Sequence, residues 1–357
     1  KKLYRRKSLE LMTTHQLREI CRQEKIIQGM IDPMDKEELI HVIMRFRGTR
    51  EELLIRSENK EGRERLEQIF IQGKVRAEQD KSLHIPSKII VYKGLSMDEN
   101  DRIHIPFCSE LQDTNALLLS GGKKICGIFS LKKGNEGEDC LYVVKDKNMD
   151  CEEADLKDYD LYCFRQGDSD RLFSIYYGMT GDLLQTLTGY RVPLMDVEVR
   201  EPIELRMPLV IDFGSTNTTA GVYLDSLYFE EAKGAPFTDR LEKNAIQYTA
   251  FEDGRKLMPS AVGVIAVKQG RPEFAFGQTA VDLSNSSYVD EGFSIFYDMK
   301  RWISDYEKEE EITDREGRRT FLSRKEIIKA FFAHIISMAE NRFKCHVSRI
   351  HASCPVK

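Results

Sequence analysis

The spacing of hydrophobic and polar residues divides the chain into four stretches. The first, residues 1–50, predicts a small helical module with two helices separated by a break at Gly29. Apolar residues recur there at three- and four-residue spacing, which is typical of amphipathic helices. The apolar positions are Leu17, Ile20 and Cys21 in the first helix and Leu39, Ile40, Ile43 and Met44 in the second.

The second stretch, residues 51–82, is highly charged and predicts a helical linker. Its apolar stripe is sparse: Leu53, Leu54, Leu66, Ile69 and Phe70. A coiled coil needs at least about three regular heptads, and this pattern is too short and too irregular for one. We therefore expect the segment to connect the helical module to the next domain.

The third stretch, residues 83–204, changes to short β-prone runs separated by clusters of turn-forming residues. This spacing predicts a compact β-rich sandwich or barrel domain, and it resembles no family that we can name. The predicted runs are Lys88 to Tyr92, Arg102 to Phe107, Ile125 to Leu131, Leu141 to Val144, Leu161 to Phe164 and Leu172 to Tyr177.

The fourth stretch, residues 205–357, alternates strands and helices, as an α/β domain does. Its clearest helix follows Ser323, which with Glu326 has the form of a capping box. Apolar residues then follow at helical spacing: Ile327, Ile328, Phe331, Phe332, Ile335, Ile336 and Ala339.

The most informative segment of the fourth stretch is a β-hairpin predicted over residues 209–224. An apolar run ends in Asp212, and small residues form the turn before a second apolar run begins. Glycine lets a backbone approach a ligand closely, and a row of N–H and hydroxyl donors suits a phosphate chain. An aspartate beside them suits a hydrated magnesium ion. The alternative is an ordinary tight hairpin rich in hydroxyl groups. The candidate phosphate-binding residues are Gly214, Ser215, Thr216 and Asn217, and the candidate metal-binding residue is Asp212.

This hairpin resembles the first phosphate-binding loop of the actin-like ATPase superfamily. Four segments further along the chain resemble parts of one branch, the DnaK-type heat-shock chaperones, and appear in the same order at similar spacings. They are Met258–Val264, Phe276–Ala280, Tyr297–Ile303 and Val347–Pro355. The Lys300-Arg301 pair favours the chaperone branch over actin. Each short motif is weak by itself, whereas five in order make a stronger signal.

The resemblance implies that residues 205–357 are the first, ribonuclease-H-like lobe of a DnaK-like ATPase domain. It implies ATP and magnesium as ligands, with magnesium held through water by Asp212, and a nucleotide-dependent conformational switch or chaperone-like ATPase as the function. The family's second phosphate loop would follow Lys357. We therefore expect the chain to be a piece of a longer protein, and we expect this piece by itself to bind ATP weakly or not at all and to be inactive.

One departure from the family leaves a second interpretation open. Val281 stands where the chaperones carry a lysine that helps to position the attacking water. A valine side chain has no hydrogen-bonding group. The second interpretation is a binding or scaffold protein with a degenerate ATPase lobe, and a measurement of ATP hydrolysis by the full-length protein would separate it from the first.

The helical module at residues 1–50 resembles SAP-type and Rho-N-terminal-type modules, which often bind nucleic acid. Residues 1–48 hold eleven Lys and Arg against seven Asp and Glu, a local net charge of +4. The candidate phosphate contacts are Lys2, Arg5, Arg6 and Lys7. The alternative is a module that packs against, or binds, a protein partner or client. A nucleic-acid-associated regulator is therefore a third interpretation.

Composition excludes few of these interpretations. The chain of 357 residues has a formal net charge of −5, which argues against a globally basic nucleic-acid binder. No run of 18 apolar residues exists, so we expect no membrane span. The eight cysteines are scattered without metal-ligand spacing, which favours free thiols in a reducing, cytoplasmic compartment.

Overall fold

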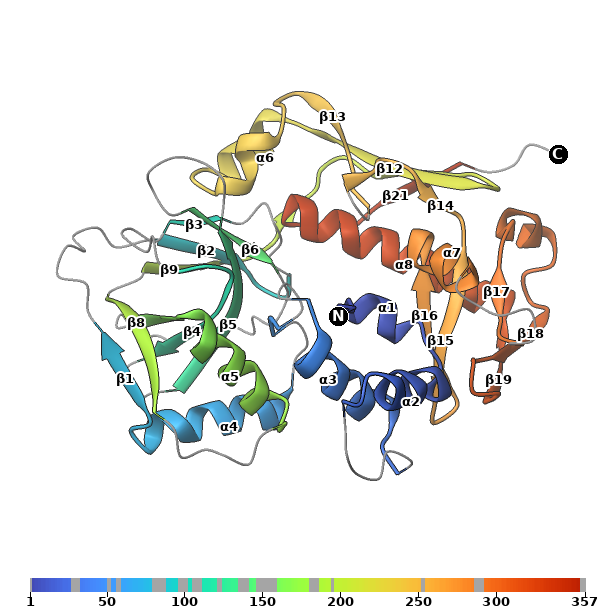
Figure 1. The fold of residues 1–357 in the computed structure, drawn as a ribbon. Coiled ribbons are helices and arrows are strands. Elements are labelled where there is room, and N and C mark those ends of the chain that lie inside the picture. Colours follow the sequence, from blue (N-terminus) through green and yellow to red (C-terminus); the bar gives the residue numbers. More distant parts are fainter. Residues whose placement is uncertain are drawn as a thin grey trace. The chain divides into compact units, whose positions relative to one another are not determined.

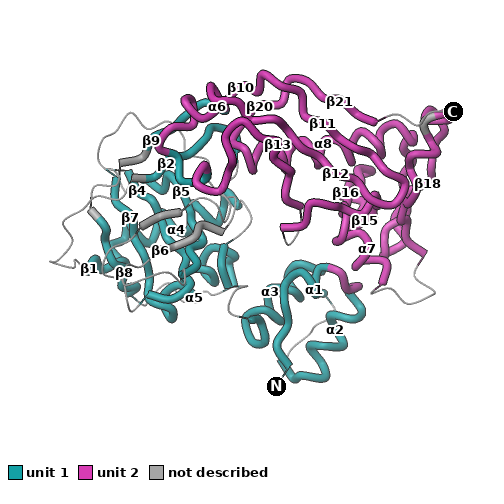
Figure 2. Tube along the Cα trace, turned by 90° about the horizontal axis from the view of Figure 1, so that it is seen from above, with its two compact units in different colours: residues 1–10, 14–202, 235–237 teal, residues 11–13, 203–234, 238–357 magenta. Residues whose placement is uncertain are grey.

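A computed structural model of the chain forms two compact units (Figure 2). Unit 1 contains residues 1–10, 14–202 and 235–237, and unit 2 contains residues 11–13, 203–234 and 238–357. Within the described residues, no helix combines the length and apolar character that crossing a bilayer requires. The structure describes residues 2–26, 33–49, 53–55, 59–78, 88–95, 102–104, 111–120, 124–133, 141–145, 159–179, 186–193, 196–251, 254–285 and 292–353.

Unit 1 begins with three helices, of which the sequence predicted the second and third. They are α1 Arg6–Glu10, α2 Thr14–Gln23 and α3 Lys36–Arg47. The carboxylate of Asp35 accepts from the Glu38 N–H, and the Glu38 side chain accepts from the Asp35 N–H, so α3 starts with a complete capping box. The predicted break at Gly29 lies outside the described residues.

A seven-stranded sheet forms the centre of unit 1 (Figure 1). Its strand order is β1-β8-β7-β4-β5-β6-β3. Strands β1 and β8 pair in parallel, and the other neighbours pair antiparallel. The strands are β1 Val75–Glu78, β3 Arg102–His104, β4 Thr114–Ser120, β5 Lys124–Lys133, β6 Leu141–Lys145, β7 Tyr159–Phe164 and β8 Leu187–Pro193.

Both faces of this sheet are covered. Helices α4 (Lys60–Ile71) and α5 (Gln166–Tyr176) share one apolar cluster with Leu117 and Leu119 of β4. The intervening Ala116 and Leu118 belong to a second cluster, which includes Ile89 and Val91 of the parallel pair β2 (Lys88–Tyr92) and β9 (Asp196–Arg200). Alternate residues of β4 therefore enter different cores, and all seven are buried.

Three sequence predictions for this region are wrong. The predicted strand Leu172 to Tyr177 is the end of helix α5, because Ser169, Leu172, Phe173 and Tyr176 are buried at helical spacing. Residues 60–78, which the sequence placed in a linker, form α4 and β1 and contribute to the core of unit 1. Among the described residues of this region, the sheet is open and mixed, with helices on one face and the β2–β9 pair on the other, and it does not close into the predicted barrel or form a simple β-sandwich.

Unit 2 contains the predicted hairpin within a five-stranded sheet. The strand order is β13-β12-β11-β21, and β14 also pairs with β12. Strand β21 lies parallel to β11, whereas β12 and β13 run antiparallel to their neighbours. The strands are β11 Leu209–Phe213, β12 Asn217–Leu224, β13 Ala245–Tyr248, β14 Met258–Pro259 and β21 Ile350–Ala352.

Helix α8 (Arg324–Phe343) covers one face of this sheet. It begins at Ser323 with the predicted capping box, and the rings of Phe331 and Phe332 lie 5.8 and 5.2 Å from the ring of Phe213 on β11. The predicted helix and its apolar stripe are therefore confirmed, and helices and mixed sheets make up both units.

The remaining elements of unit 2 are smaller. Strand β15 pairs with β16 and β17, and β18 pairs with β19. The bounds are α6 Ser226–Glu231, β15 Val262–Lys268, β16 Arg271–Phe276, α7 Gly277–Asn285, β17 Ile295–Phe296, η4 Met299–Ser304, β18 Glu309–Thr313, β19 Arg319–Ser323 and the parallel pair β10 Ile203–Glu204 and β20 Cys345–His346. The short helix η2 Pro236–Arg240 lies between α6 and β13 in the sequence.

Candidate functional site

The turn between β11 and β12 is tight. The two strands pair up to Phe213 and Thr218, and the Gly214 N–H then donates to the Asn217 carbonyl at 3.1 Å. A Cβ at position 214 would overlap the carbonyl oxygen of Asn217. A glycine is therefore required here by close backbone approach, as the sequence predicted.

The tip of the hairpin presents groups that suit an anionic ligand. Ser215, Thr216 and Asn217 are exposed, and neither Ser215 nor Thr216 donates its N–H to another residue that the structure describes. The carboxylate of Asp212 is also exposed and makes no hydrogen bond or ion pair within the described part of the chain. Two open amides, three polar side chains and one open carboxylate thus lie within six consecutive residues.

A residue that the sequence analysis did not select, Ser260, holds this tip from inside the protein. Its N–H donates to the Thr216 carbonyl at 2.8 Å, and its hydroxyl donates to the Gly214 carbonyl at 2.7 Å. The hydroxyl oxygen of Thr218 lies 2.8 Å from that of Ser260, and both residues are buried. Ser260 belongs to the segment Met258–Val264, so two of the segments that carry the resemblance are in direct contact.

A second serine outside the predicted set lies beside the end of β11. Ser353 follows β21, its hydroxyl accepts from the Phe213 N–H at 2.9 Å, and its N–H donates to the Ile211 carbonyl at 2.9 Å. The carboxyl ends of the parallel strands β11 and β21 therefore meet next to Asp212. In open α/β sheets, ligands bind at the carboxyl ends of the parallel strands.

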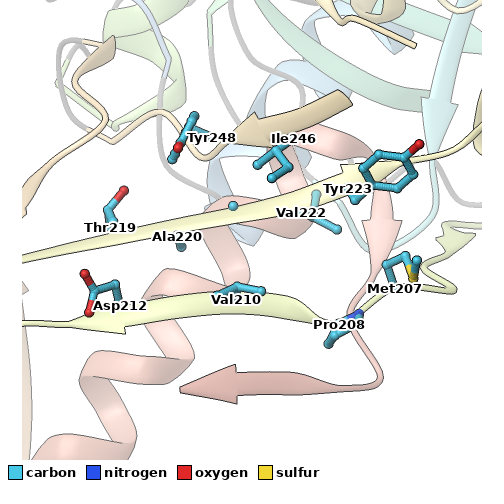
Figure 3. A pocket seen from close by; sticks show the side chains of 11 residues that line it. Met207, Pro208, Val210, Asp212, Thr219, Ala220, Val222, Tyr223, Ile246 and Tyr248 are labelled. Atoms are coloured by element: carbon cyan, nitrogen blue, oxygen red, sulfur yellow. The ribbon is translucent and has the colours of Figure 1, made fainter. Parts of the chain in front are cut away.

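An apolar groove lies on the sheet face opposite α8. Val210 and Asp212 alternate with the residues of β11 that pack toward α8, so their side chains point to the other face. The groove has a volume of about 350 Å³, and Figure 3 shows its side chains. Val210, Tyr223, Ile246 and Tyr248 are 38–62% exposed there. Asp212 is the one acidic residue of the lining.

A further segment of the resemblance, Phe276–Ala280, packs against Met258. Gly277 begins α7 with a left-handed φ of 59°, its N–H donates to the Ala261 carbonyl at 3.0 Å, and a Cβ there would overlap the Met258 side chain. Phe276 stacks on His334 of α8 at 4.5 Å. Val281, on α7, packs against a small apolar cluster that includes Ala280 and Leu283.

The segment Tyr297–Ile303 contains η4, where Arg301 pairs with Asp298. The guanidinium of Arg324 lies 5.1 Å from the ring centre of Trp302. The last segment, Val347–Pro355, provides β21 and Ser353, and its end from residue 354 onward lies outside the described residues.

The four basic residues near the N-terminus have different surroundings. Arg6 is largely covered and bonds Glu10 at 2.8 Å and Glu37 at 2.7 Å. Lys2 lies 5.2 Å from the ring centre of Tyr4, whereas Arg5 and Lys7 are exposed. Arg6 is therefore occupied by carboxylates of its own module, unlike the other three.

The described cysteines act as buried apolar residues. Cys21, Cys126, Cys163 and Cys345 are buried and form no disulfide. Burial, followed by the nearby Glu340 and Glu204, raises the pKa of the Cys345 thiol far above its ordinary value, which suppresses the thiolate form. The other four cysteines fall outside the described residues. Among the residues described, no cluster of His, Cys, Asp and Glu has the arrangement of a metal site.

Comparison with known protein families finds no family that matches this chain, and a search of curated proteins finds no matching sequence.

Proposed function

We propose that the tip of the β11–β12 hairpin binds the phosphate chain of magnesium-bound ATP. In this proposal the N–H groups of Ser215 and Thr216 and the polar side chains of residues 215–217 hold the phosphates. Gly214 lets the backbone approach them closely, and Asp212 holds hydrated magnesium. Residues 205–357 are then a DnaK-like lobe of the actin-like ATPase superfamily. The full-length protein changes conformation with its nucleotide, and residues 1–204 engage a protein partner or client in the cytoplasm.

The observation that carries the proposal is the state of the hairpin tip. Its backbone is held rigidly by Ser260 and by the Gly214–Asn217 hydrogen bond, yet the amides of Ser215 and Thr216 have no partner among the described residues. Rigid, unoccupied N–H groups beside an exposed carboxylate are what a magnesium–phosphate ligand requires. Preorganised donors of this kind stabilise phosphoryl groups without reorganising when the ligand binds.

The parallel pairing of β11 with β21 also supports the proposal. It brings Ser353 next to Asp212 although 141 positions separate them in the sequence. An ordinary hairpin would need no such neighbour, whereas a ligand site at the carboxyl ends of parallel strands would.

A second function, a scaffold with a degenerate ATPase lobe, is favoured by Val281. Its side chain packs in the apolar cluster at the base of α7 and contributes no polar group. Binding and hydrolysis are therefore separate questions, and a protein that binds magnesium-ATP without turnover fits this alternative.

The test is the variant Asp212→Asn in the full-length protein, which removes the charge but keeps the side-chain shape. We expect an unchanged melting temperature and a magnesium-dependent ATP affinity or turnover lower by at least about tenfold, equivalent to about 1.4 kcal/mol. Asp239→Asn is the matched control, because Asp239 is also an exposed carboxylate of unit 2 and lies outside the tip. Wild-type magnesium dependence in a folded Asp212→Asn protein would remove Asp212 from the site.

A further inference from the structure

The strongest unassigned feature of unit 2 is the buried hydroxyl pair beneath the hairpin tip. Ser260 is 2% exposed and Thr218 is fully buried. A serine hydroxyl has one proton, and that of Ser260 is directed to the Gly214 carbonyl at 2.7 Å. Thr218 must therefore be the donor in its 2.8 Å contact with Ser260. The two hydroxyls form a directed chain from Thr218 through Ser260 to Gly214.

This chain fixes the orientation of one peptide plane at the tip. In a trans peptide, the carbonyl and the following N–H point in opposite directions, and the structure contains no cis peptide bond among its described residues. The Gly214 carbonyl is held inward by Ser260, so the N–H of Ser215 is directed outward, away from the protein. The Ser260 N–H also binds the Thr216 carbonyl at 2.8 Å and anchors the other side of the turn.

We propose that Ser260 is the positioning residue of the phosphate-binding tip, acting with Thr218 to direct the Ser215 N–H toward the ligand. This inference rests on the proposed function, because it assigns a role in holding a phosphate chain. Ser260 touches the backbone of the tip and not the ligand. Removal of the Ser260 hydroxyl frees the Gly214–Ser215 peptide to rotate. The Ser215 N–H is then no longer directed toward the ligand, while the rest of the site remains.

The test compares Ser260→Ala with Ser130→Ala in the full-length protein. Ser130 is a matched control, because it is also a fully buried serine whose hydroxyl donates to a backbone carbonyl, that of Ile55, at 2.7 Å. It lies in unit 1. Both variants should lower the melting temperature by similar small amounts. Only Ser260→Ala should weaken magnesium-ATP binding, by at least about tenfold.

The readout that a merely structural role would not change is the ratio of ATP affinity to AMP affinity. Loss of an aimed phosphate donor weakens binding of the long phosphate chain more than that of the monophosphate, whereas general loosening weakens both alike. Thr218→Val, which removes the first hydroxyl of the chain at nearly constant volume, should shift the ratio in the same direction by less. If Ser260→Ala does not fold, Thr218→Val tests the same positioning role.

The possible outcomes distinguish failure of this inference from failure of the proposed function on which it rests. A wild-type protein that fails to bind magnesium-ATP overturns both. A wild-type protein that binds, with Ser260→Ala and Thr218→Val both keeping its ATP-to-AMP affinity ratio, overturns the positioning role and leaves the proposed function intact. A reduced ratio in either variant, with Ser130→Ala unchanged, supports the role of Ser260.

Discussion

The central sheets of the two units are covered differently. In unit 1, two helices and the β2–β9 pair bury opposite faces of the seven-stranded sheet, and every residue of β4 is buried. In unit 2, α8 buries one face of the five-stranded sheet, and the other face presents an apolar groove that reaches Asp212.

This difference in coverage predicts that mutations will affect the two sheets differently. A side chain enclosed on all sides can contribute packing energy but cannot meet a ligand, whereas an exposed group contributes little to stability and remains open for binding. We therefore expect substitution of a covered residue to lower the free energy of unfolding. Substitution of an uncovered residue of unit 2 should instead change the affinity for a ligand. Four predictions test this contrast.

The largest effect is expected at Phe129, at the centre of the core between the unit 1 sheet and the β2–β9 pair. Its side chain is fully buried, so Phe129→Ala leaves a cavity and should cost about 3–5 kcal/mol of unfolding free energy. Ile246→Ala, on the open face of the unit 2 sheet at 62% exposure, should change it by less than about 0.5 kcal/mol. Urea denaturation measures both, and equal losses would contradict the contrast.

The second effect compares two aspartates within unit 2. Asp314 is buried and accepts hydrogen bonds from the N–H groups of Val267, Glu316 and Arg318 and from the Arg318 guanidinium. Asp314→Asn turns an amide donor toward one of these donors and should cost about 1–3 kcal/mol. Asp212→Asn should leave unfolding unchanged. Thermal denaturation of both variants checks this, and similar melting temperatures would show that Asp314 is not a structural carboxylate.

The same carboxylate should make unit 2 sensitive to acid. Burial alone would raise the pKa of Asp314, but the hydrogen bonds from Val267 and Arg318 outweigh it, so the folded-state pKa is lower than usual. A lowered carboxyl pKa contributes stability above the unfolded value, near 3.9, and this contribution disappears as the pH falls below it. Asp314→Asn should therefore flatten the acid side of the stability profile.

A third, smaller effect is expected at His41 in unit 1. Burial, and then the neighbouring Arg6, lower the pKa of its imidazole, while Glu37, Asp35 and Glu38 act in the opposite sense. The unfolded chain therefore binds a proton at His41 more readily than the folded protein does. The contribution of His41 to the free energy of unfolding is thus complete above about pH 6.5 and declines as the pH falls further.

The variant His41→Phe tests this effect because it keeps an aromatic ring beside Tyr177, whose ring centre lies 4.7 Å from that of His41. The loss of unfolding free energy from about pH 7.5 to about pH 5.5 should be smaller in the variant than in the wild type. An identical pH dependence in the two proteins would show that His41 does not contribute.

The smallest effect on stability is expected for the exposed basic residues of the N-terminal module. Replacing Lys2, Arg5 and Lys7 together by Ala should leave the melting temperature nearly unchanged. If the module binds nucleic acid, the same variant should reduce the slope of log affinity against log salt by about three. Arg6→Ala should instead lower stability, because its ion pairs with Glu10 and Glu37 are lost. Absence of binding at low salt in the wild type would leave the packing or protein-interaction role.

Local patterns predicted part of this architecture. The helices α2, α3 and α8, the capping box at Ser323 and the β11–β12 hairpin depend on residues within a few positions of each other, and periodicity and turn chemistry report such relations. The segment 166–177 shows where this fails. Its glycine and aspartate resembled a turn and its aromatic end resembled a strand, but the face that it buries against α4 and the sheet made it a helix.

The sequence alone selected Asp212 and Gly214–Asn217 as candidate residues, because the motif that suggests a phosphate-binding turn lies in consecutive residues. It did not identify Ser260, Ser353 or the apolar groove. Ser260 lies 42 positions from Thr218, and Ser353 lies 140 positions from Phe213. The groove is lined mainly by the three strands β11, β12 and β13. Such pairings are chosen by burial and backbone hydrogen bonding across the whole unit, not by local preference. The chemistry of the tip is therefore local, whereas its rigidity and orientation come from the fold.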